Sequence, residues 1–383
     1  MPLSIVLASR GLKTTILDIN PEAVANVNSG KLPFFEPGAA PLLHEALEQG
    51  LLTATIYPQC IEAADTVIVI IGTPVDEHLN PNPNALIAAL DANRGHFRDG
   101  QLIVLRSTIF PGVTESISDY FVSIGLKVDV AFCPERIAEH AAIEELVNLP
   151  QIVAGITKRA TERASEIFLR LTKEIVVLSP GEAELAKLFT NSWRYIKFAA
   201  ANQFFMMAND LGLDYERIRH AIKYEYPRAI DLPGAGFAAG PCLFKDTMQL
   251  SAVSSNNFFL GHSAMLVNEG LPAYVVDKLE EKYGSLKDKN IGILGMAFKG
   301  GSDDIRSSLS YKLKRQLDFK AKSVKITDPL VSLETEPRLL NLQEVLDSSD
   351  ILIIGAPHKE YRSLNTKADI VDIWNVQNSG VLI

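Results

Sequence analysis

The sequence predicts an α/β protein in which two doubly wound domains flank a helical middle domain. Short apolar runs rich in Val and Ile recur through the first part of the chain, nearly vanish from residue 179 to about residue 283, and then return. Apolar runs without polar alternation indicate strands buried on both faces of a parallel sheet, with helices between them. We therefore expect an N-terminal domain at residues 1–178, a helical domain at 179–285 and a C-terminal domain at 286–383.

Six apolar runs indicate the strands of the first domain. They are Thr14–Ile19, Thr66–Ile71, Leu102–Leu105, Val128–Phe132, Ile152–Ile156 and Ile175–Leu178. Before them, Pro2–Ser9 is expected to be a helix, and Gly11 suits its C-terminal cap. A doubly wound nucleotide domain usually opens with a strand and a G-x-G-x-x-G turn ahead of this helix. We expect the first strand and that turn to lie before Met1, outside these residues.

Helical patterns dominate the middle of the chain. A long helix is expected from Gly181 to about Leu211, and it offers a surface for a homodimer. Further helices are expected to about Tyr283, after which four strands follow. They are Ile291–Leu294, Val324–Thr327, Ile351–Gly355 and Ile370–Ile373.

The two ends of the chain resemble each other. Asp18 and Asp328 each close an apolar run, and each is followed by a later run that ends in Gly-x-Pro, at residues 72–74 and 355–357. This repetition suggests two doubly wound domains of the same kind.

Composition limits the class of protein. Of 383 residues, 47% are hydrophobic and 22% charged, which is typical of a globular chain. The net charge of −9 argues against nucleic-acid or anionic-membrane partners, because both favour an excess of Lys and Arg. Cys60, Cys133 and Cys242 lack CxxC spacing, which favours a reducing compartment over disulfides or zinc. We find no signal peptide and no run of about 20 apolar residues, and so expect a cytoplasmic protein without a metal.

The stretch Gly234–Gln249, GAGFAAGPCLFKDTMQ, is the most informative part of the sequence for chemistry. A loop rich in Gly and Ala lets the backbone approach a ligand closely, and Cys242 follows it directly. Lys245 would favour the thiolate, and Asp246 is able to act as a base or to orient water. The alternative is a small buried cysteine in a packed loop. These residues alone leave both interpretations open.

Motifs spread over nearly the whole chain resemble the UDP-glucose/GDP-mannose dehydrogenase family. They are Pro2-Leu3 with residues 8–11, Leu17–Asn20, Phe35–Gly38, Gly72–Val75, Ser107-Thr108 with Pro111-Gly112, Cys133–Glu139, Glu184–Asn191, Gly240–Thr247, Val267–Glu269 and Gly295–Arg306. The resemblance implies Rossmann-like end domains, NAD as cofactor, a nucleotide-sugar substrate and a place in polysaccharide biosynthesis. It also implies oxidation of a sugar C6 alcohol to a carboxylate, through a thiohemiacetal and a thioester on cysteine.

By motif position, the resemblance assigns catalytic roles. Cys242 would be the nucleophile, and Asp246 would activate water or take up a proton. Lys187 and Asn191, one helical turn apart, would stabilise the developing oxyanion. Each residue also has a structural alternative, such as a solvated helix position for Lys187.

Three further residues would act beside these. Glu135 would assist thioester hydrolysis, and Thr108 and Glu139 would hold water near the nicotinamide. The residues implied at the cofactor are Asp18, Thr73, Thr108, Glu139 and Arg306. Those implied at the substrate are Glu135, Arg136, Ile137, Lys187, Asn191, Arg228, Gly236, Gly240, Phe298 and Lys299.

Some features depart from the family pattern. The glycine-rich turn is absent from these residues, and without its backbone N–H groups we expect weak binding of NAD. Residues 238–241, Ala-Ala-Gly-Pro, stand where family members usually have paired glycines, and Asp372 is followed by Ile373 where UDP-glucose enzymes often have Arg. The hexose therefore stays open. Two other hypotheses remain: a nucleotide-sugar-binding paralogue that has lost NAD, and a single-step hydroxyacid or 6-phosphogluconate-like dehydrogenase that needs no cysteine.

Overall fold

The computed structural model describes residues 1–32, 34, 36–72 and 84–383. The chain divides into two units with dense internal contacts, residues 1–190 and 191–383. The α/β fold class predicted from the sequence is confirmed by the parallel sheets and their covering helices. The finer division into three domains stays a prediction.

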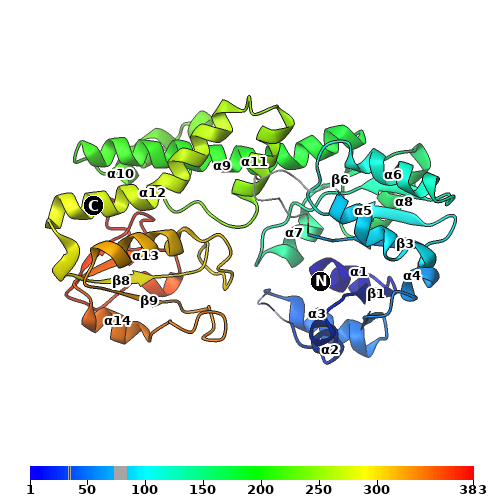
Figure 1. Cartoon of the computed structure of the whole chain (residues 1–383), viewed down its shortest axis with the longest axis horizontal. Coiled ribbons are helices and arrows are strands. Elements are labelled where there is room, and N and C mark those ends of the chain that lie inside the picture. Colours follow the sequence, from blue (N-terminus) through cyan, green and yellow to red (C-terminus); the bar gives the residue numbers. More distant parts are fainter. Residues whose placement is uncertain (33, 35, 73–83) are drawn as a thin grey trace. The chain divides into compact units, whose positions relative to one another are not determined.

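The strands of the first unit form two sheets (Figure 1). The larger has the order β3 (Thr66–Val69), β4 (Leu102–Leu105), β5 (Asp129–Phe132), β6 (Gln151–Gly155) and β7 (Ile175–Val177). The smaller pairs β1 (Thr14–Leu17) in parallel with β2 (Leu52–Thr55). All six predicted strands are present.

Two features of these sheets differ from the prediction. β6 runs antiparallel to β5, although all other pairings are parallel. An apolar run reports burial and carries no information on strand direction, which here is set by the segment containing α7 (Ala142–Asn148). β2 was not predicted, because only Leu52 and Ala54 alternate inward in a strand of four residues.

Helix α1 (Pro2–Ser9) confirms the expected helix at the start of these residues, and Gly11 follows it with a φ of +80°. Its side chains contribute to two apolar clusters. Leu3, Val6 and Leu7 pack in a cluster with β4, whereas Ile5 and Ala8 pack in a cluster with β2 and α3 (Ala39–Glu48). Asn20 caps α2 (Pro21–Asn28) by accepting the N–H groups of Glu22 and Ala23.

Helices cover both faces of the larger sheet. On one face lie α5 (Asn84–Asp91) and α6 (Val113–Ser123), and on the other lie α7 and α8 (Lys158–Phe168). The short helices α4 (Cys60–Ala63) and η1 (Arg94–His96) join strands at its edge. This two-sided cover explains why every residue of β4 and β5 is buried.

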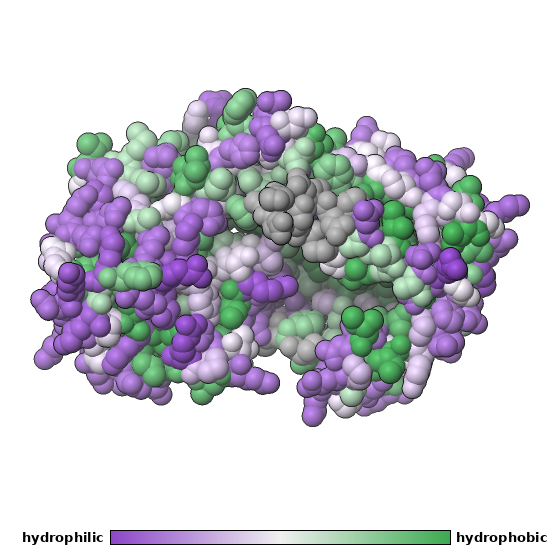
Figure 2. Space-filling view, viewed as in Figure 1, coloured by the Kyte–Doolittle hydropathy of each residue, from purple (hydrophilic) through white to green (hydrophobic). Residues whose placement is uncertain are grey.

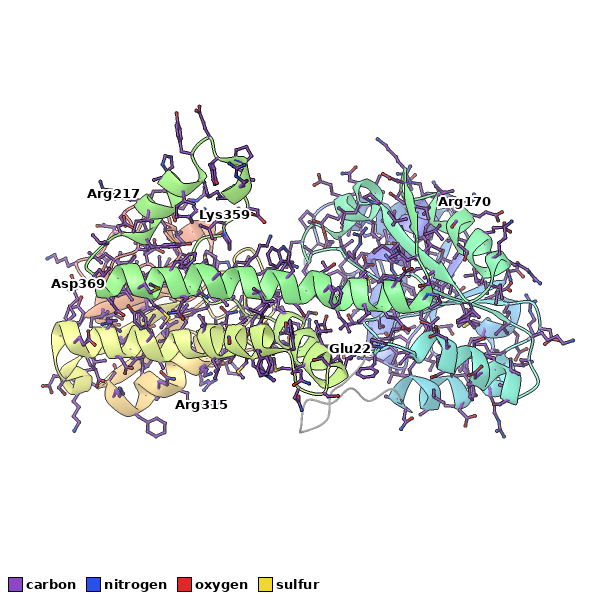
Figure 3. The ribbon with its side chains drawn as sticks, turned by 90° about the horizontal axis from the view of Figure 1, so that it is seen from above. Glu22, Arg170, Arg217, Arg315, Lys359 and Asp369 are labelled. Atoms are coloured by element: carbon purple, nitrogen blue, oxygen red, sulfur yellow. The ribbon has the colours of Figure 1, made fainter. Side chains whose placement is uncertain are left out.

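The second unit starts within α9 (Pro180–Asp210), which confirms the long helix predicted from Gly181. The helices that follow are α10 (Tyr215–Lys223), η2 (Pro227–Ala229), α11 (Leu243–Val253) and α12 (Phe259–Tyr283). α9 and α12 lie side by side, and Phe205, Ala208 and Leu271 belong to their shared core (Figure 3). Arg217 and Arg315 point outward from this unit.

The C-terminal sheet is entirely parallel, with the order β11 (Asp369–Val371), β10 (Ile351–Ile354), β8 (Asn290–Leu294) and β9 (Ser323–Thr327). α13 (Leu309–Lys320) and α14 (Leu342–Ser348) cover its two faces (Figure 1). Short turns η3 (Leu286–Asp288) and η4 (Lys359–Tyr361) precede β8 and β11.

Asp18 directly follows β1 and Asp328 directly follows β9, at the two ends of the chain that the sequence repeat relates. β8 lies between β9 and β10, whereas in the first unit no described residue forms a strand that joins β1 to β3.

On the visible face of the second unit, hydrophilic residues predominate over scattered hydrophobic ones (Figure 2). Within the described parts of the chain, no helix has both the length and the apolar character needed to cross a membrane.

Candidate active site

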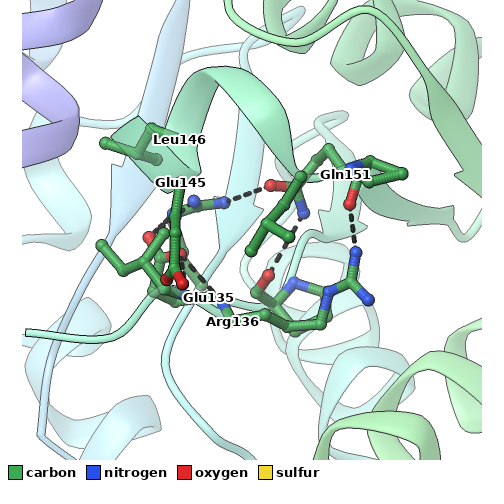
Figure 4. A pocket seen from close by; sticks show the side chains of 10 residues that line it. Glu135, Arg136, Glu145, Leu146 and Gln151 are labelled. Carbon is green, nitrogen blue, oxygen red and sulfur yellow. Dashed lines mark hydrogen bonds and ion pairs between the residues drawn. The ribbon is translucent and has the colours of Figure 1, made fainter. Parts of the chain in front are cut away.

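Glu135 is the centre of a cluster of polar contacts in the first unit (Figure 4). It lies in the loop after β5. One carboxylate oxygen, Oε2, accepts from Arg106 Nε at 2.9 Å and lies 2.6 Å from Arg106 Nη2. The other, Oε1, accepts the N–H groups of Arg136 at 2.9 Å and Ile137 at 3.1 Å. A carboxylate offers about four lone-pair sites, so these four donors engage its full accepting capacity.

Arg106 fixes this carboxylate, and sequence reasoning missed it. The side chain follows β4 directly and is 1% exposed. It also donates to the carbonyl oxygen of Cys133 at 3.0 Å and to Gln151 Oε1 at 3.1 Å, and its guanidinium lies 5.0 Å from the centre of the Phe168 ring. A buried cation requires such a set of partners. The available signal was an arginine placed immediately after an uninterrupted apolar strand.

Lys187 joins the same cluster from α9. Its Nζ donates to the backbone carbonyl of Glu135 at 2.5 Å. One turn earlier, the buried Glu184 carboxylate accepts the N–H groups of Gly112 at 2.7 Å and Thr114 at 2.9 Å. These amides belong to the N-terminus of α6, where a carboxylate is favourable. Glu184 therefore anchors the start of α9 to the first unit and so helps to place Lys187.

The structure brings four predicted residues of the first unit together. Glu135, Arg136 and Ile137 line one shallow pocket (Figure 4), and Lys187 contacts the backbone of Glu135. Arg136 donates to the carbonyl oxygen of Pro150 at the rim of that pocket, and burial lowers the pKa of its guanidinium. Thr108 is half-buried and Glu139 exposed. Thr73 lies outside the described residues.

Cys242 begins a second cluster, in the second unit. It is exposed and is the N-cap residue of α11, and its carbonyl oxygen accepts the N–H of Asp246 at 2.9 Å. The Asp246 side chain is fully buried, and its Oδ2 accepts from Asn191 Nδ2 at 2.5 Å. Lys245 Nζ lies 3.5 Å from Asp246 Oδ1. The first turn of α11 thus places a buried carboxylate directly behind an exposed thiol.

The three cysteines differ in their surroundings. Burial raises the pKa of Cys133 to about 12 and also raises the pKa of the half-buried Cys60. Both therefore favour the protonated thiol, which is a poor nucleophile. Cys242 is exposed at a helix N-terminus, where negative charge is stabilised. Among the cysteines, it is the one placed for nucleophilic chemistry, and the buried-cysteine alternative is not what the structure shows.

The glycine-rich loop before Cys242 is fixed by a buried pair of asparagines. Asn202 Oδ1 accepts the N–H of Gly236 at 2.9 Å, and Asn202 Nδ2 donates to the carbonyl oxygen of Gly236 at 3.0 Å. Asn202 also donates to Asn268 Oδ1, and Asn268 donates to the carbonyl oxygen of Tyr195. Asn202 was not predicted. Asn268 belongs to the family motif Val267–Glu269, but the sequence does not indicate its contacts with Asn202 and Tyr195, which lie on α9.

Both predicted glycines of this loop lie against aromatic rings. A Cβ atom on Gly236 would collide with the Trp374 ring, and one on Gly240 would lie 2.7 Å from the Phe298 ring. Gly240 also has a φ of +105°, which side chains rarely permit. Phe298 therefore sits against the backbone two residues before Cys242. Lys299 Nζ lies 5.6 Å from the centre of the Phe298 ring.

Replacing Gly240 by alanine is expected to lower the free energy of unfolding by about 2–6 kcal/mol, because backbone strain and overpacking each cost about 1–3 kcal/mol. Urea unfolding of the whole chain measures the effect. Gly234→Ala is the matched control, since a Cβ at Gly234 meets nothing within 4 Å. Equal midpoints for the two variants would contradict the close approach of Phe298.

The remaining predicted residues have local partners. Arg306 pairs with Asp304, with Nε 2.9 Å from Oδ2. Arg228 is exposed in η2, where it donates to the Tyr226 hydroxyl at 3.0 Å and stacks on that ring. This is the solvated position that a lone arginine usually takes. Asp18 is exposed at the carboxyl end of β1, and its Oδ1 accepts the N–H of Asn20 at 2.9 Å. An exposed carboxylate there fits the ribose hydroxyls of a dinucleotide.

Doubly wound sheets with an exposed carboxylate at a strand end are typical of nucleotide-dependent oxidoreductases. Family models match in three consecutive stretches: the NAD binding domain of the UDP-glucose/GDP-mannose dehydrogenase family at residues 1–172, its central domain at 181–269 and its UDP binding domain at 292–379. The chain belongs to the UDP-glucose/GDP-mannose dehydrogenase family, whose members are NAD-dependent nucleotide-sugar dehydrogenases.

Known relatives match over nearly the whole chain. The NDP-N-acetyl-D-galactosaminuronic acid dehydrogenase of Ralstonia solanacearum is 30% identical, with 96% of this chain and 90% of that protein covered. The UDP-N-acetyl-D-mannosamine dehydrogenase of Pyrococcus horikoshii is 29% identical, with 95% and 88% covered.

Two solved structures of nucleotide-sugar dehydrogenases are similar in fold to this chain. The P. horikoshii UDP-D-ManNAc dehydrogenase has a TM-score of 0.87 at 28% identity, covering 95% of this chain and 88% of that one. The UDP-glucose dehydrogenase of Pyrobaculum islandicum has a TM-score of 0.89 at 26% identity, covering 97% and 90%.

Proposed function

We propose that this chain oxidises the C6 alcohol of a UDP-linked N-acetylhexosamine to the carboxylate, with Cys242 as covalent catalyst. The observation that carries the proposal is the exposed Cys242 at the N-terminus of α11, with the Asn191–Asp246 hydrogen bond buried behind it. The choice of an N-acetylated sugar rests on the relatives, several of which are named for such substrates.

The cysteine is needed for the second oxidation. The Cys242 thiolate adds to the C6 aldehyde, so that a C–S bond forms and the carbonyl electron pair moves to oxygen. Lys187 and Asn191, one turn apart on α9, are the donors proposed for that oxygen. NAD, when bound, takes up the hydride in each of the two oxidations. Water then attacks the resulting thioester, and the C–S bond breaks to release the carboxylate and the thiolate.

We assign the proton acceptor for that water to Asp246 rather than to Glu135. The four donors around Glu135 occupy its carboxylate, so it could accept a proton only by giving up a contact. Glu135 is better suited to hold its own loop, and through its backbone carbonyl it holds Lys187. Asp246 lies in the first turn of α11, four residues after Cys242.

Cofactor and nucleotide would use residues at strand ends. Asp18 would accept ribose hydroxyls of NAD, and Thr108 and Glu139 would lie toward the nicotinamide. Phe298 would stack on the uracil, while Lys299 would supply positive charge to the diphosphate despite the acidic chain. Arg306 is also proposed to contact the cofactor, and Arg228 to contact the substrate.

The test is an assay of the full chain with NAD and a panel of UDP-N-acetylmannosamine, UDP-N-acetylgalactosamine and UDP-glucose. NADH formation is followed spectroscopically, and the product is identified by mass. Two NADH per uronate formed, with an N-acetylated sugar preferred, supports the proposal. Binding of a UDP-sugar without NADH formation would instead support the nucleotide-sugar-binding paralogue.

We further propose that the chain acts as a homodimer through α9. Trp193, Phe204 and Met207 lie on this helix and Leu211 directly follows it, and each is about half exposed or more. Other side chains of α9, among them Phe205 and Ala208, are buried in the core shared with α12. A stripe of exposed large apolar side chains of this kind is typical of an interface between subunits.

Met207→Asp is expected to weaken self-association at least about tenfold, because it would bury an unpaired charge. Sedimentation velocity over a range of concentrations measures the change. Phe319→Asp is the control, since Phe319 is 86% exposed on α13, outside the stripe. An unchanged sedimentation coefficient for Met207→Asp would exclude α9 as the dimer surface.

A further inference from the structure

His358 and Asp328 form a fully buried pair that the proposed chemistry does not use. Both side chains are 0% exposed, and His358 Nε2 lies 3.2 Å from Asp328 Oδ2. Asp328 closes β9, and His358 follows the Gly-x-Pro that closes β10. In the other copy of the repeat, Asp18 is exposed. A pair of groups with this degree of burial persists only where its contacts hold something in place.

Asp328 holds two loops at once. Its Oδ2 accepts the N–H groups of Met296 at 2.7 Å and Ala297 at 3.0 Å, in the loop after β8. Its Oδ1 accepts the N–H groups of Leu330 at 2.9 Å and Val331 at 3.0 Å. With four backbone donors and His358, the buried carboxylate is fully satisfied.

The hydrogen bonds assign the tautomer of His358. The N–H of Gly301 lies 3.2 Å from His358 Nδ1, and because a backbone amide only donates, Nδ1 must be the unprotonated nitrogen. The ring proton is then on Nε2, facing Asp328. His358 thus accepts from the end of the loop at residues 295–301, and its Nε2 lies 3.2 Å from the carboxylate that holds the beginning of that loop.

Packing leaves this loop no room to shift. A Cβ atom on Gly295 would lie 2.6 Å from the backbone nitrogen of Ala356, and one on Gly300 would collide with the carbonyl of Pro357. The loop at residues 295–301 therefore packs closely against the segment 355–358. Between the two ends of the loop lies Phe298, whose ring contacts the backbone of Gly240.

We propose that His358 is a positioning residue: by accepting the Gly301 N–H while its Nε2 lies against the Asp328 carboxylate, it fixes the loop that presents Phe298 and Lys299 to the nucleotide. This rests on the proposed function, which assigns that loop to uracil and diphosphate. Phe298, in the same loop, also contacts Gly240. A shift of this loop would therefore also affect the segment that leads to Cys242.

Two variants distinguish the contact of His358 with the Gly301 N–H from its contact with Asp328. In His358→Asn, the amide oxygen stands near the position of Nδ1 and can still accept from Gly301. In His358→Gln, the amide reaches the position of Nε2 beside Asp328, but the Gly301 N–H loses its acceptor. Calorimetric titration of the full chain with UDP, well below each unfolding midpoint, is the measurement.

Loss of the acceptor for the Gly301 N–H releases the end of the loop and is expected to weaken UDP binding about tenfold in His358→Gln, whereas His358→Asn stays within about threefold of the unaltered chain. Both variants are expected to lower the unfolding midpoint. A merely structural role of His358 would therefore not make UDP affinity lower in the Gln variant than in the Asn variant. Equal UDP affinity in the unaltered chain and in a folded Gln variant overturns the proposal.

Hydrogen exchange on the unaltered chain tests the link without any substitution. The Gly301 amide is expected to be protected although it lies in a loop, and exchange at the rate of an unstructured glycine overturns the proposal. Absence of UDP binding in the unaltered chain, together with a protected Gly301, would count against the proposed function and leave the positioning of the loop supported.

Discussion

Cys242→Ser is expected to reduce formation of the uronate by on the order of 10³-fold or more, because removing a nucleophile removes the step that every later step requires. A hydroxyl in its place is far less ionised than a thiol and would add poorly to the aldehyde. The measurement is NADH formation from the nucleotide sugar that the unaltered chain prefers, with the product identified by mass.

Cys60→Ser is the matched control for this variant. Cys60 is half-buried in the short helix α4, where burial raises its pKa, and its replacement should leave turnover nearly unchanged. Undiminished turnover in Cys242→Ser would favour the single-step dehydrogenase, whose reaction needs no cysteine. UDP affinity should be similar in all three proteins.

Arg106→Met is expected to destabilise the chain by about 3–5 kcal/mol, since removal of one partner leaves a buried or half-buried charge without compensation. Arg106 is 1% exposed and the Glu135 side chain 30% exposed, so solvent replaces little of the lost contact. Chemical unfolding, with a probe in the first unit, measures the loss. Turnover should fall as well, because the loop that holds Lys187 would relax.

Lys158→Met provides the comparison with an exposed pair. Lys158 Nζ lies 3.6 Å from Glu162 Oε1, and the two side chains are 91% and 61% exposed. Exposed pairs contribute about 0–1 kcal/mol, so this variant should unfold close to the unaltered chain. A similar loss in both variants would show that burial does not govern the contribution of Arg106.

The sequence located strands well because apolar runs report burial directly. Leu102–Leu105 and Ile351–Ile354 are wholly buried and were predicted nearly to the residue. β2 was missed because a four-residue strand with two inward side chains carries too little periodicity. The antiparallel β6 was missed because direction depends on the path of the connecting segment, which an apolar run does not encode.

The candidate site was predictable by residue but not by contact. Motif order identified Cys242, Asp246 and Lys187, yet the partners of Glu135 required the fold. Arg106 lies 29 positions from Glu135, and Glu184 lies 70 positions from Thr114. Side chains that meet at such separations leave no local pattern. The same holds for His358, which sequence reasoning did not mention.

Helix α1 gives the first unit an unusual dependence. Its eight residues present Leu3, Val6 and Leu7 to the cluster of the larger sheet, while Ile5 and Ala8 enter the cluster of the smaller one. The two sheets share no backbone ladder among the described strands, so other contacts connect them: α1 enters both clusters, Ile143 of α7 also packs against both, and Glu36 accepts two N–H groups at the start of α7. The position of Asp18, at the end of the smaller sheet, therefore depends on α1 together with the segment around α7.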